Sequence, residues 1–282
     1  MKLGAFDIYP MTDGRFRLDG GAMFGVVPKA LWQKCCPADE LNRIPLHLNC
    51  LLIRAHGKHV LVDTGLGDKE DAKFHTMFAV ERTPSLRDSL HRHGLTPNDI
   101  HLVINTHLHF DHAGGNTVTN GNGALLPAFP NATYYVQQGE YDDAIAANER
   151  TRASYRQNNF TPVAQLNQWE LIQGDTQLLP GITTVVTAGH TRFHQSVKVE
   201  SEGRIAFFLG DLIPTVSHLP LPYIMGYDLD PLRTLDTKRR VLDQAFAENW
   251  LLLFEHDPLI QAGHLRKDVE GRYVLEEVQL WQ

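Results

Sequence analysis

One short segment of the chain, residues 105–116, contains four side chains that can bind a metal ion. It reads NTHLHFDHAGGN, so His107, His109, Asp111 and His112 fall within six residues. Imidazole nitrogen and carboxylate oxygen are ligands for zinc and similar divalent metals. On a helix the first two histidines would point to different sides, whereas in a loop residues two apart can converge on one point. The spacing therefore predicts a metal site on a loop.

The elements around this segment predict how such a site would be assembled. Residues 100–105 (IHLVIN) read as a buried strand that leads directly into the four ligands. Three more ligand-type side chains follow predicted strands: His190 after residues 183–187, Asp211 after residues 204–209, and His256 after residues 250–254. We therefore expect all seven side chains to meet at one edge of the fold, on loops at strand ends.

The order of the remaining elements predicts the architecture. Strand-like runs occur at residues 46–55, 59–63, 133–137, 196–200 and 273–280, helical patterns at 85–93, 140–157 and 231–246, and a loop-like stretch rich in Gly, Asn and Pro at 119–130. Strands followed by helices, twice over, predict two packed sheets with helices outside. No linker rich in Pro, Gly or Ser divides the chain, so we expect residues 1–282 to form one domain.

The pattern His-x-His-x-Asp-His after a strand resembles the signature of the metallo-β-lactamase superfamily. Residues 61–65 (LVDTG) are similar to that family's early strand and turn, and the later His, Asp and His occur in the order that the family shows. The similarity extends from about Leu46 to about His256. It implies an α+β fold, the αββα metallo-β-lactamase-like sandwich of two mixed sheets with helices outside.

The same resemblance implies a centre with two divalent metal ions, zinc in the first place and manganese, iron or cobalt as alternatives. It assigns His107, His109 and His190 to one metal, and Asp111, His112 and His256 to the other, with Asp211 bridging both. Asp111 and Asp211 would be catalytic, and Asp111 would carry a proton to the leaving group. Asp63 is expected to contact the metal ligands rather than the metals. His194 is expected either to do the same or to be an ordinary packing residue of a strand.

Two further segments, residues 20–32, expected as an N-terminal loop, and residues 211–228, are similar to the pocket segments of quorum-quenching lactonases and related organophosphate hydrolases. Their apolar side chains are expected to line the substrate pocket: Met23, Phe24, Trp32, Ile213, Leu219, Tyr223, Ile224 and Met225. His218 and Tyr223 are candidate donors to a substrate oxygen. Some lactonases have a tyrosine three residues after the bridging Asp, where this chain has Pro214.

Together these features predict a metal-dependent hydrolase that opens an ester ring by attack of a metal-bridging hydroxide. The substrate expected first is a small apolar lactone such as an N-acyl homoserine lactone. The alternatives are hydrolysis of organophosphate triesters or aryl esters. A metal-binding protein without catalytic activity would be expected to have lost ligands, and all seven are present.

The composition argues against several other classes of protein. With 26 Lys and Arg against 33 Asp and Glu, the net charge is −7, which disfavours binding to nucleic acid or to anionic membranes. A signal peptide is not expected, because Asp7 and Asp13 stand where its apolar segment would be. The three cysteines, two of them adjacent, do not form a disulfide framework, so we expect a cytoplasmic protein. The resemblance alone implies a homodimer.

Overall fold

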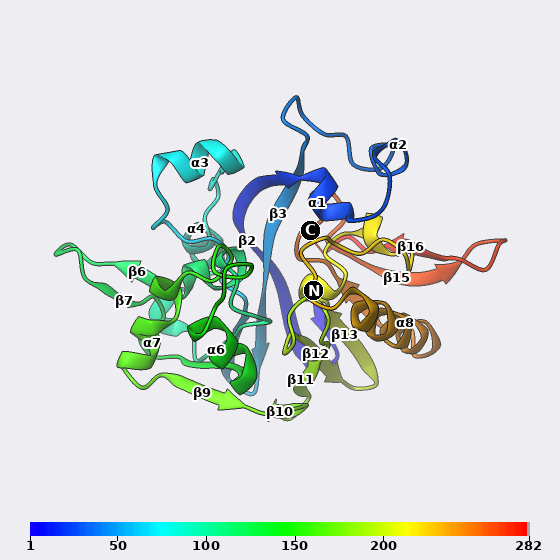
Figure 1. The fold of residues 1–282 in the computed structure, drawn as a ribbon. Coiled ribbons are helices and arrows are strands. Elements are labelled where there is room, and N and C mark those ends of the chain that lie inside the picture. Colours follow the sequence, from blue (N-terminus) through cyan, green and yellow to red (C-terminus); the bar gives the residue numbers. More distant parts are fainter. Residues whose placement is uncertain (281–282) are drawn as a thin grey trace.

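Two seven-stranded β-sheets pack face to face at the centre of the molecule (Figure 1). The computed structural model describes residues 1–280. The first sheet has the order β1 (Lys2–Leu3), β2 (Phe6–Asp19), β3 (Arg43–Ala55), β4 (Lys58–Val62), β5 (Leu102–Ile104), β8 (Thr133–Gln137) and β9 (Trp169–Ile172). The second has the order β10 (Thr176–Leu179), β11 (Ile182–Val186), β12 (Gln195–Ser201), β13 (Arg204–Phe208), β14 (Leu251–Leu253), β15 (Ala262–Lys267) and β16 (Tyr273–Glu277).

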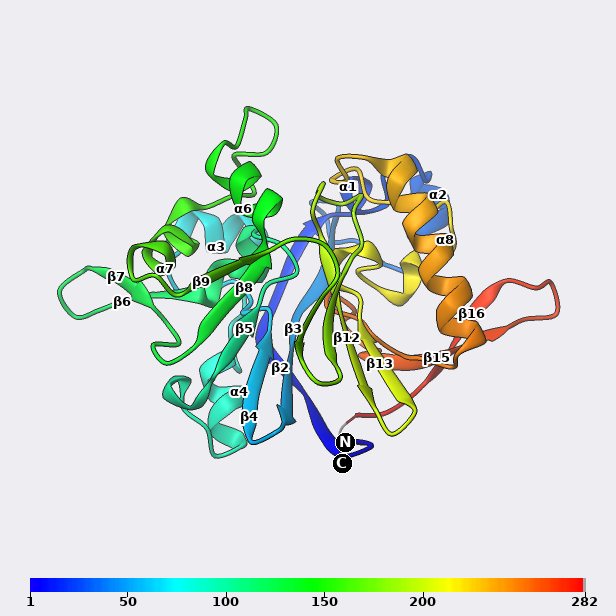
Figure 2. The same ribbon diagram turned by 90° about the horizontal axis from the view of Figure 1, so that it is seen from below.

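Helices cover the outer faces of both sheets. The α-helices within residues 1–280 are α1 (Gly20–Phe24), α2 (Lys29–Trp32), α3 (Ala72–Phe78), α4 (Leu86–Arg92), α5 (Phe110–Ala113), α6 (Gln138–Ile145), α7 (Thr161–Gln165) and α8 (Pro231–Ala247). Figure 2 shows α4 beside the first sheet and α8 along the outer side of the second. Both sheets contain parallel and antiparallel pairs, so the predicted αββα sandwich is confirmed.

Strands β13 and β14 illustrate why the second sheet is buried on both faces. They form a parallel pair, and successive side chains along each strand point to opposite sides. Ala206 and Phe208 face the core between the sheets, whereas Phe207 packs beneath α8 with Leu252. Continuous apolar runs are typical of strands covered on both sides. Because the two strands are parallel, the loops that follow them leave the sheet at the same edge.

Helix α8 closes the outer layer over the second sheet. Its start is set by Pro231 in the first turn and by Asp230, whose side chain accepts a hydrogen bond of 3.1 Å from the backbone of Arg233. Val241, Leu242 and Ala245 lie on its buried face against the sheet. No helix within residues 1–280 is long and apolar enough to cross a membrane.

Several local expectations differ from the structure. Residues 20–32, expected as a loop, contain the short helices α1 and α2, and residues 119–130 contribute to a hairpin of β6 (Thr117–Thr119) and β7 (Leu125–Pro127). The helix expected over residues 140–157 is only α6, which ends at Ile145. It stops there because the side chain of Asn148 accepts hydrogen bonds from the backbone of Arg150 and Thr151 and stabilises a turn instead.

Candidate metal centre

Four loops at one edge of the two sheets bring the seven ligand-type side chains together. The loop after β5 carries His107 and His109, and Asp111 and His112 follow on the short helix α5 rather than on a loop. His190 precedes β12, Asp211 follows β13 and His256 follows β14. The Nε2 atoms of His112 and His256 are 3.2 Å apart although 144 positions separate these residues. Each of the seven residues is exposed by 9% or less, so their charges need partners within the protein.

Within residues 1–280, four overlapping groups of three side chains have a spacing that could hold a metal ion, and two of these groups are the sets predicted from the sequence. The first group is His107, His109 and His190, and the second is Asp111, His112 and His256. Within each group the candidate atoms lie within 4.8 Å of one another. Two ligands of one zinc ion are at most about 4 Å apart, because each bond measures about 2.0–2.1 Å. Each group is therefore close to the size that one bound ion requires.

Asp211 lies between the two groups. Its Oδ2 is 3.2 Å from His190 Nε2, and its Oδ1 is 3.1 Å from His256 Nε2, so one carboxylate oxygen faces each group. Gly210 turns the chain into this position with a φ of 52°. A Cβ at Gly210 would lie 2.7 Å from His194 Nε2, so both the backbone angle and the space require glycine.

Hydrogen bonds on the outer side orient four of the imidazole rings toward the centre. The Nδ1 atoms of these rings contact an outer oxygen: His107 with Thr106 Oγ1 (3.0 Å), His112 with Asp63 Oδ2 (3.1 Å), His190 with Asp228 Oδ1 (2.9 Å) and His256 with the His47 carbonyl (2.8 Å). Because each Nδ1 faces an outer oxygen, each Nε2 faces the centre, and in the neutral form of the ring it presents a lone pair there. The buried atoms His107 Nε2 and Asp211 Oδ1 have no hydrogen-bond partner within residues 1–280. Converging acceptors of this kind fit divalent metal ions.

Burial and charge set the protonation of these rings. Burial, together with positive neighbours, lowers the pKa of His107 and His109 well below the usual value, so both are neutral, the form that binds metal. At His256 the opposing effect of burial is outweighed by the charge of Asp211, which raises the pKa to about 9. A metal ion at this position must displace that proton, so its affinity is expected to fall as the pH falls.

Asp63 lies behind the ligands. Its carboxylate accepts hydrogen bonds from Thr106 N (2.8 Å) and Thr106 Oγ1 (2.6 Å), as well as from His112 Nδ1. Its backbone has a φ of 54°, a left-handed conformation that is unfavourable for a residue other than glycine. The conformation aims the carboxylate at the loop after β5, and it is held by these three hydrogen bonds.

His194 also lies behind the ligands, and it positions the backbone of Asp211. Its Nε2 accepts a hydrogen bond of 3.1 Å from Asp211 N, and its Nδ1 lies 2.8 Å from Thr187 Oγ1. Burial, helped by the nearby His190, lowers the pKa of His194 to about 3. The ring is therefore neutral and can accept the bond from Asp211 over the whole physiological range.

Two buried carboxylic acids around the ligands were not predicted from the sequence. Asp228 contacts His190, as described above, and Glu255 Oε1 lies 3.0 Å from His112 Nδ1. Burial, with the charge of Asp63, raises the pKa of Glu255 well above its usual value, so this acid is held in its neutral form. Glu255 could have been noticed because it directly precedes His256 at a strand end. Asp228 has no such signal, because a long irregular segment separates it from β13.

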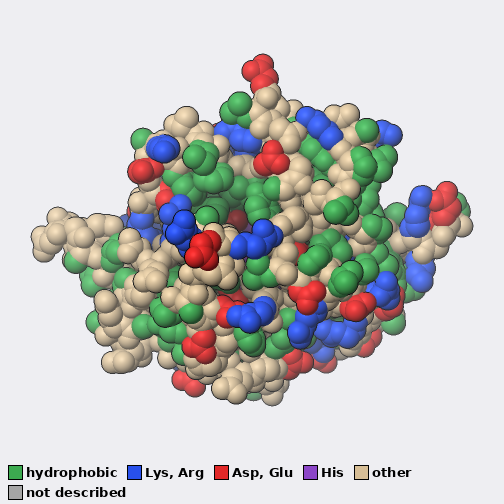
Figure 3. All heavy atoms as spheres, viewed as in Figure 1, with side chains coloured by type: hydrophobic (Ala, Val, Ile, Leu, Met, Phe, Trp, Pro, Cys, Tyr) green, Lys and Arg blue, Asp and Glu red, His purple; other side chains and the backbone are tan. Residues whose placement is uncertain are grey.

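A cavity of about 170 Å³ opens at this cluster, and five of the seven side chains line it. It is lined by Leu18, Met23, Phe78, His109, Phe110, Asp111, Ala153, His190, Asp211, Met225, Tyr227 and His256. It faces the side of the molecule seen in Figure 3, where a hollow near the centre has mostly hydrophobic walls. Of the residues expected to line a pocket, Met23 and Met225 do so. Leu18, Phe78, Phe110, Ala153 and Tyr227 line it without having been predicted.

Most of the other residues expected in the pocket lie in the core instead. Phe24, Trp32, Ile213, His218 and Leu219 are at most 3% exposed, and Tyr223 and Ile224 are half-buried outside the cavity lining. The ring of Phe24 stacks between those of Trp32 (5.4 Å) and His218 (4.5 Å). His218 Nε2 is bonded to the Met23 carbonyl at 2.8 Å. This packing supports the cavity wall from behind, and it leaves His218 unable to serve as a donor to substrate.

The sandwich fold and the cluster of histidines and aspartates beneath a cavity define a metal-binding hydrolase. Residues 43–256 match the model of the metallo-beta-lactamase superfamily, and the chain belongs to that superfamily. It is a metal-dependent hydrolase with a centre for divalent metal ions.

Known relatives include lactonases. The chain is 32% identical to an N-acyl homoserine lactonase of Bacillus cereus over 77% of this chain and 83% of the relative. It is 27% identical to an N-acyl homoserine lactonase of Rhizobium radiobacter over 63% of this chain and 62% of the relative. A Staphylococcus aureus protein described as a "probable metal-dependent hydrolase" superimposes with a TM-score of 0.90 at 33% identity, over 99% of this chain and all of the other. An N-acyl homoserine lactone hydrolase with N-hexanoyl-L-homoserine bound at its metal centre gives a TM-score of 0.69 at 25% identity, over 92% and 95% of the two chains.

Proposed function

We propose that this protein is a lactonase that opens N-acyl homoserine lactones with the help of two zinc ions. The observation that carries the proposal is the cluster of seven ligand-type side chains, five of which line a small apolar cavity. The relatives from Bacillus cereus and Rhizobium radiobacter support a lactone as the substrate over other esters.

The two groups of three side chains would each hold one ion, and Asp211 would bridge them. When bound, the ions would act as Lewis acids on a substrate carbonyl. They would also lower the pKa of water enough for it to lose a proton and act as a nucleophile near neutral pH. The protein's own contribution is to fix the ligand directions through Asp63, Asp228 and the His47 carbonyl. Outer hydrogen bonds of this kind commonly raise metal affinity by about 10–100-fold.

The walls of the cavity favour an uncharged substrate. Leu18, Met23, Phe78, Phe110 and Met225 supply apolar surface, and no lysine or arginine among residues 1–280 lines the cavity. Its volume of about 170 Å³ is below the roughly 300–1,000 Å³ of sites that enclose a whole drug-sized molecule. We infer that it encloses the lactone ring and the first part of the acyl chain, and that the remainder extends outside.

Tyr227 is the donor that we assign to the substrate, in place of His218 and Tyr223. It is the only residue with a hydroxyl group among those that line the cavity within residues 1–280, and no hydrogen bond within them occupies that hydroxyl. Burial, with the charges of Asp19 and Asp111, raises the pKa of Tyr227 to about 12, so the hydroxyl keeps its proton at neutral pH. It can therefore donate to an oxygen on which negative charge develops.

Asp111 is assigned the proton transfer. It lines the cavity, and its carboxylate oxygens lie 3.9 Å from His112 Nε2 and 3.8 Å from His256 Nε2. In this position it can take a proton from the attacking water and deliver it to the alkoxide that leaves when the ring opens.

A neutral phosphotriester is the second candidate substrate. Within residues 1–280 the cavity has apolar walls without a lysine or arginine, so it suits an uncharged aryl phosphotriester better than phosphate mono- and diesters, which are anionic. A phosphoryl oxygen would also benefit from Lewis acidity in the same way as a carbonyl oxygen.

The test is a comparison of substrates at known metal occupancy. Zinc-loaded protein would be assayed with N-hexanoyl homoserine lactone, an aryl phosphotriester and an aryl ester, with His109→Gln as the control for contaminating activity. We expect two zinc ions per chain and a kcat/KM that is highest for the lactone. Full occupancy without ring opening would refute the lactonase proposal, and faster phosphotriester turnover would move the assignment to the second candidate.

A further inference from the structure

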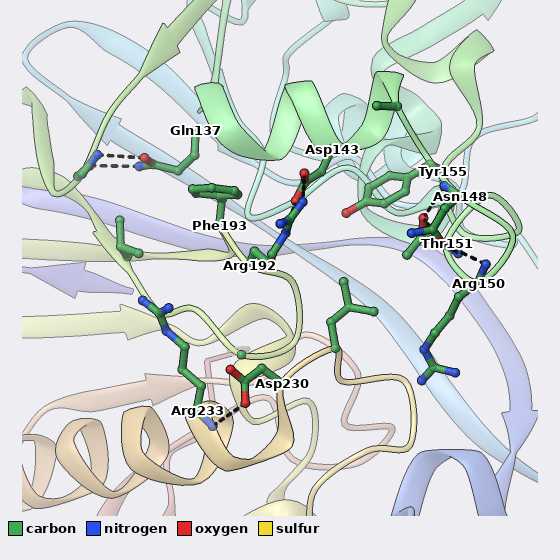
Figure 4. Close-up of a pocket in the computed structure, with 15 residues that line it drawn as sticks. Gln137, Asp143, Asn148, Arg150, Thr151, Tyr155, Arg192, Phe193, Asp230 and Arg233 are labelled. Carbon is green, nitrogen blue, oxygen red and sulfur yellow. Dashed lines mark hydrogen bonds and ion pairs between the residues drawn. The ribbon is translucent and has the colours of Figure 1, made fainter.

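A second and larger hollow lies beside the metal centre. Its volume is about 740 Å³, and it lies between α6 and the first turn of α8 (Figure 4). Tyr155 is part of its wall, and the same ring packs against the metal-site His109 with ring centres 4.8 Å apart. We call this hollow the arginine groove, because Arg150, Arg192 and Arg233 line it.

The arginine groove carries net positive charge on an acidic protein. Three arginines and two aspartates, Asp143 and Asp230, line it, so its formal charge is +1 while that of the chain is −7. Arg192 is neutralised, because its Nε donates to Asp143 at 2.9 Å and a second bond joins the same pair. The carboxylate of Asp230 caps α8. The net charge of +1 is therefore the sum of Arg150, Arg233 and Asp230, and no carboxylate forms an ion pair with either of these two guanidinium groups within residues 1–280.

These two arginines are available to a ligand. The guanidinium group of Arg233 has no partner within residues 1–280, and Arg150 makes one bond, from Nη2 to the Gly226 carbonyl at 3.0 Å. Figure 4 shows Arg150 and Arg233 at opposite ends of the groove. A guanidinium group forms bonds to a carboxylate that are shorter and stronger than its bonds to a neutral carbonyl. A carboxylate could therefore replace Gly226 as the partner of Arg150.

The same chain segments line the groove and the metal cavity. Arg150 lines the groove and Ala153 lines the cavity, and likewise Gly189 and its neighbour His190 face the two hollows. The carbonyl that binds Arg150 belongs to Gly226, which lies between the cavity residues Met225 and Tyr227. Arg150 thus stands at the boundary between the two hollows. A substrate that extends from the cavity past Gly226 would come within reach of Arg150.

We propose that the arginine groove is a subsite for a carboxylate at the end of the substrate remote from the lactone. Arg150 binds the carboxylate directly, and Arg233 adds positive potential from the far end of the groove. Small apolar surfaces of Val186, Phe193 and Leu229 accommodate the chain that carries it. The inference rests on the proposed lactonase function and adds to it a preference for acyl chains that end in an acid.

The test compares two substrates of the same length that differ only in charge. One is a homoserine lactone with an acyl chain ending in a carboxylate, and the other ends in a carboxamide. We expect the kcat/KM of wild-type protein to be about tenfold higher for the carboxylate, since a charge-assisted hydrogen bond replaces a neutral one. In Arg150→Gln the ratio of kcat/KM for the carboxylate to that for the carboxamide should fall below about twofold, while kcat/KM for the carboxamide stays at the wild-type value. In Arg233→Gln this ratio should lie between those of the wild-type protein and Arg150→Gln. Arg240→Gln is the matched control, because Arg240 is exposed on α8, the helix that carries Arg233, but lies outside the groove.

Two outcomes would overturn the inference: no preference for the carboxylate in the wild-type protein, or a preference that survives Arg150→Gln. A failure of the proposed function is distinguished by calorimetry with hydrolysis-resistant lactam analogues that carry the same two end groups. If the lactones are not opened, binding of the acid-ended lactam that depends on Arg150 still supports the subsite. Equal binding of the two lactams would reject it.

Discussion

Asp228 provides a sharp test of the metal centre, because its only described side-chain bond is to the ring of His190. The distance from Asp228 Oδ1 to His190 Nδ1 is 2.9 Å, and the two side chains are exposed by only 1% and 2%. Replacement by alanine removes the acceptor that fixes the tautomer and direction of His190. Loss of such an outer partner weakens metal binding by about 10–100-fold, or about 1.4–2.8 kcal/mol. We expect Asp228→Ala to weaken zinc binding by an amount in this range. Asp228→Asn retains an acceptor oxygen, so we expect it to weaken zinc binding by less than about tenfold.

The assay is a zinc titration against a chelator of known affinity, with metal content measured after dialysis. Asp230→Asn is the matched control, because it removes an acid two positions away that caps α8, and asparagine caps a helix about as well as aspartate. It should bind zinc like the wild-type protein. An Asp228→Ala variant that folds and retains the wild-type zinc affinity would refute the view that this carboxylate orients His190.

Three further predictions follow from individual side chains. Tyr227→Phe should lower kcat for the lactone by roughly 100-fold, the effect of removing one donor to a developing oxyanion, and leave the zinc content unchanged; an unchanged kcat would remove Tyr227 from the mechanism. For neutral acyl chains, kcat/KM should rise by up to about fourfold for each added CH₂, since each is worth about 0.8 kcal/mol, and then level off where the chain leaves the cavity; a flat response would contradict an apolar acyl site. Burial lowers the pKa of Lys238 from its usual value of 10.5 to about 7, so between these pH values the unfolded chain holds a proton that the folded chain does not. Denaturant titrations should therefore show the stability of wild-type protein rising with pH relative to Lys238→Met between about pH 7 and 10.5, and parallel curves would refute the assignment.

The local motif and the overall layers could be predicted because they depend on neighbouring residues. Residues 105–116 carry four ligand types directly after a strand, and apolar runs mark the buried strands β13 and β14. The 14-residue strand β2, in contrast, was not predicted. Its sequence, FDIYPMTDGRFRLD, contains Pro10 and Gly14 and does not look like a strand in isolation. It is held by an extended antiparallel pairing with β3, which includes a bulge around Thr12 and Arg15.

The pocket was the least predictable part of the molecule. Phe24 and Met23 are adjacent and both apolar, yet Met23 lines the cavity and Phe24 is fully buried between Trp32 and His218. An apolar side chain has the same chemistry in a core and in a pocket wall, so the sequence cannot distinguish them. Only the direction of each side chain in the packed structure does.

The sequence by itself determined the kind of chemistry, since the residue types and spacing around His107, together with the strands before them, already pointed to a metal site. Tertiary structure alone decided several of the side chains that surround this site. Asp228 behind His190, Tyr227 in the cavity and the arginine groove all depend on loops that meet only after the two sheets pack. The physical reason is that ligand identity is a property of single residues, whereas hydrogen-bond partners and cavities are set by distances between segments far apart in the chain.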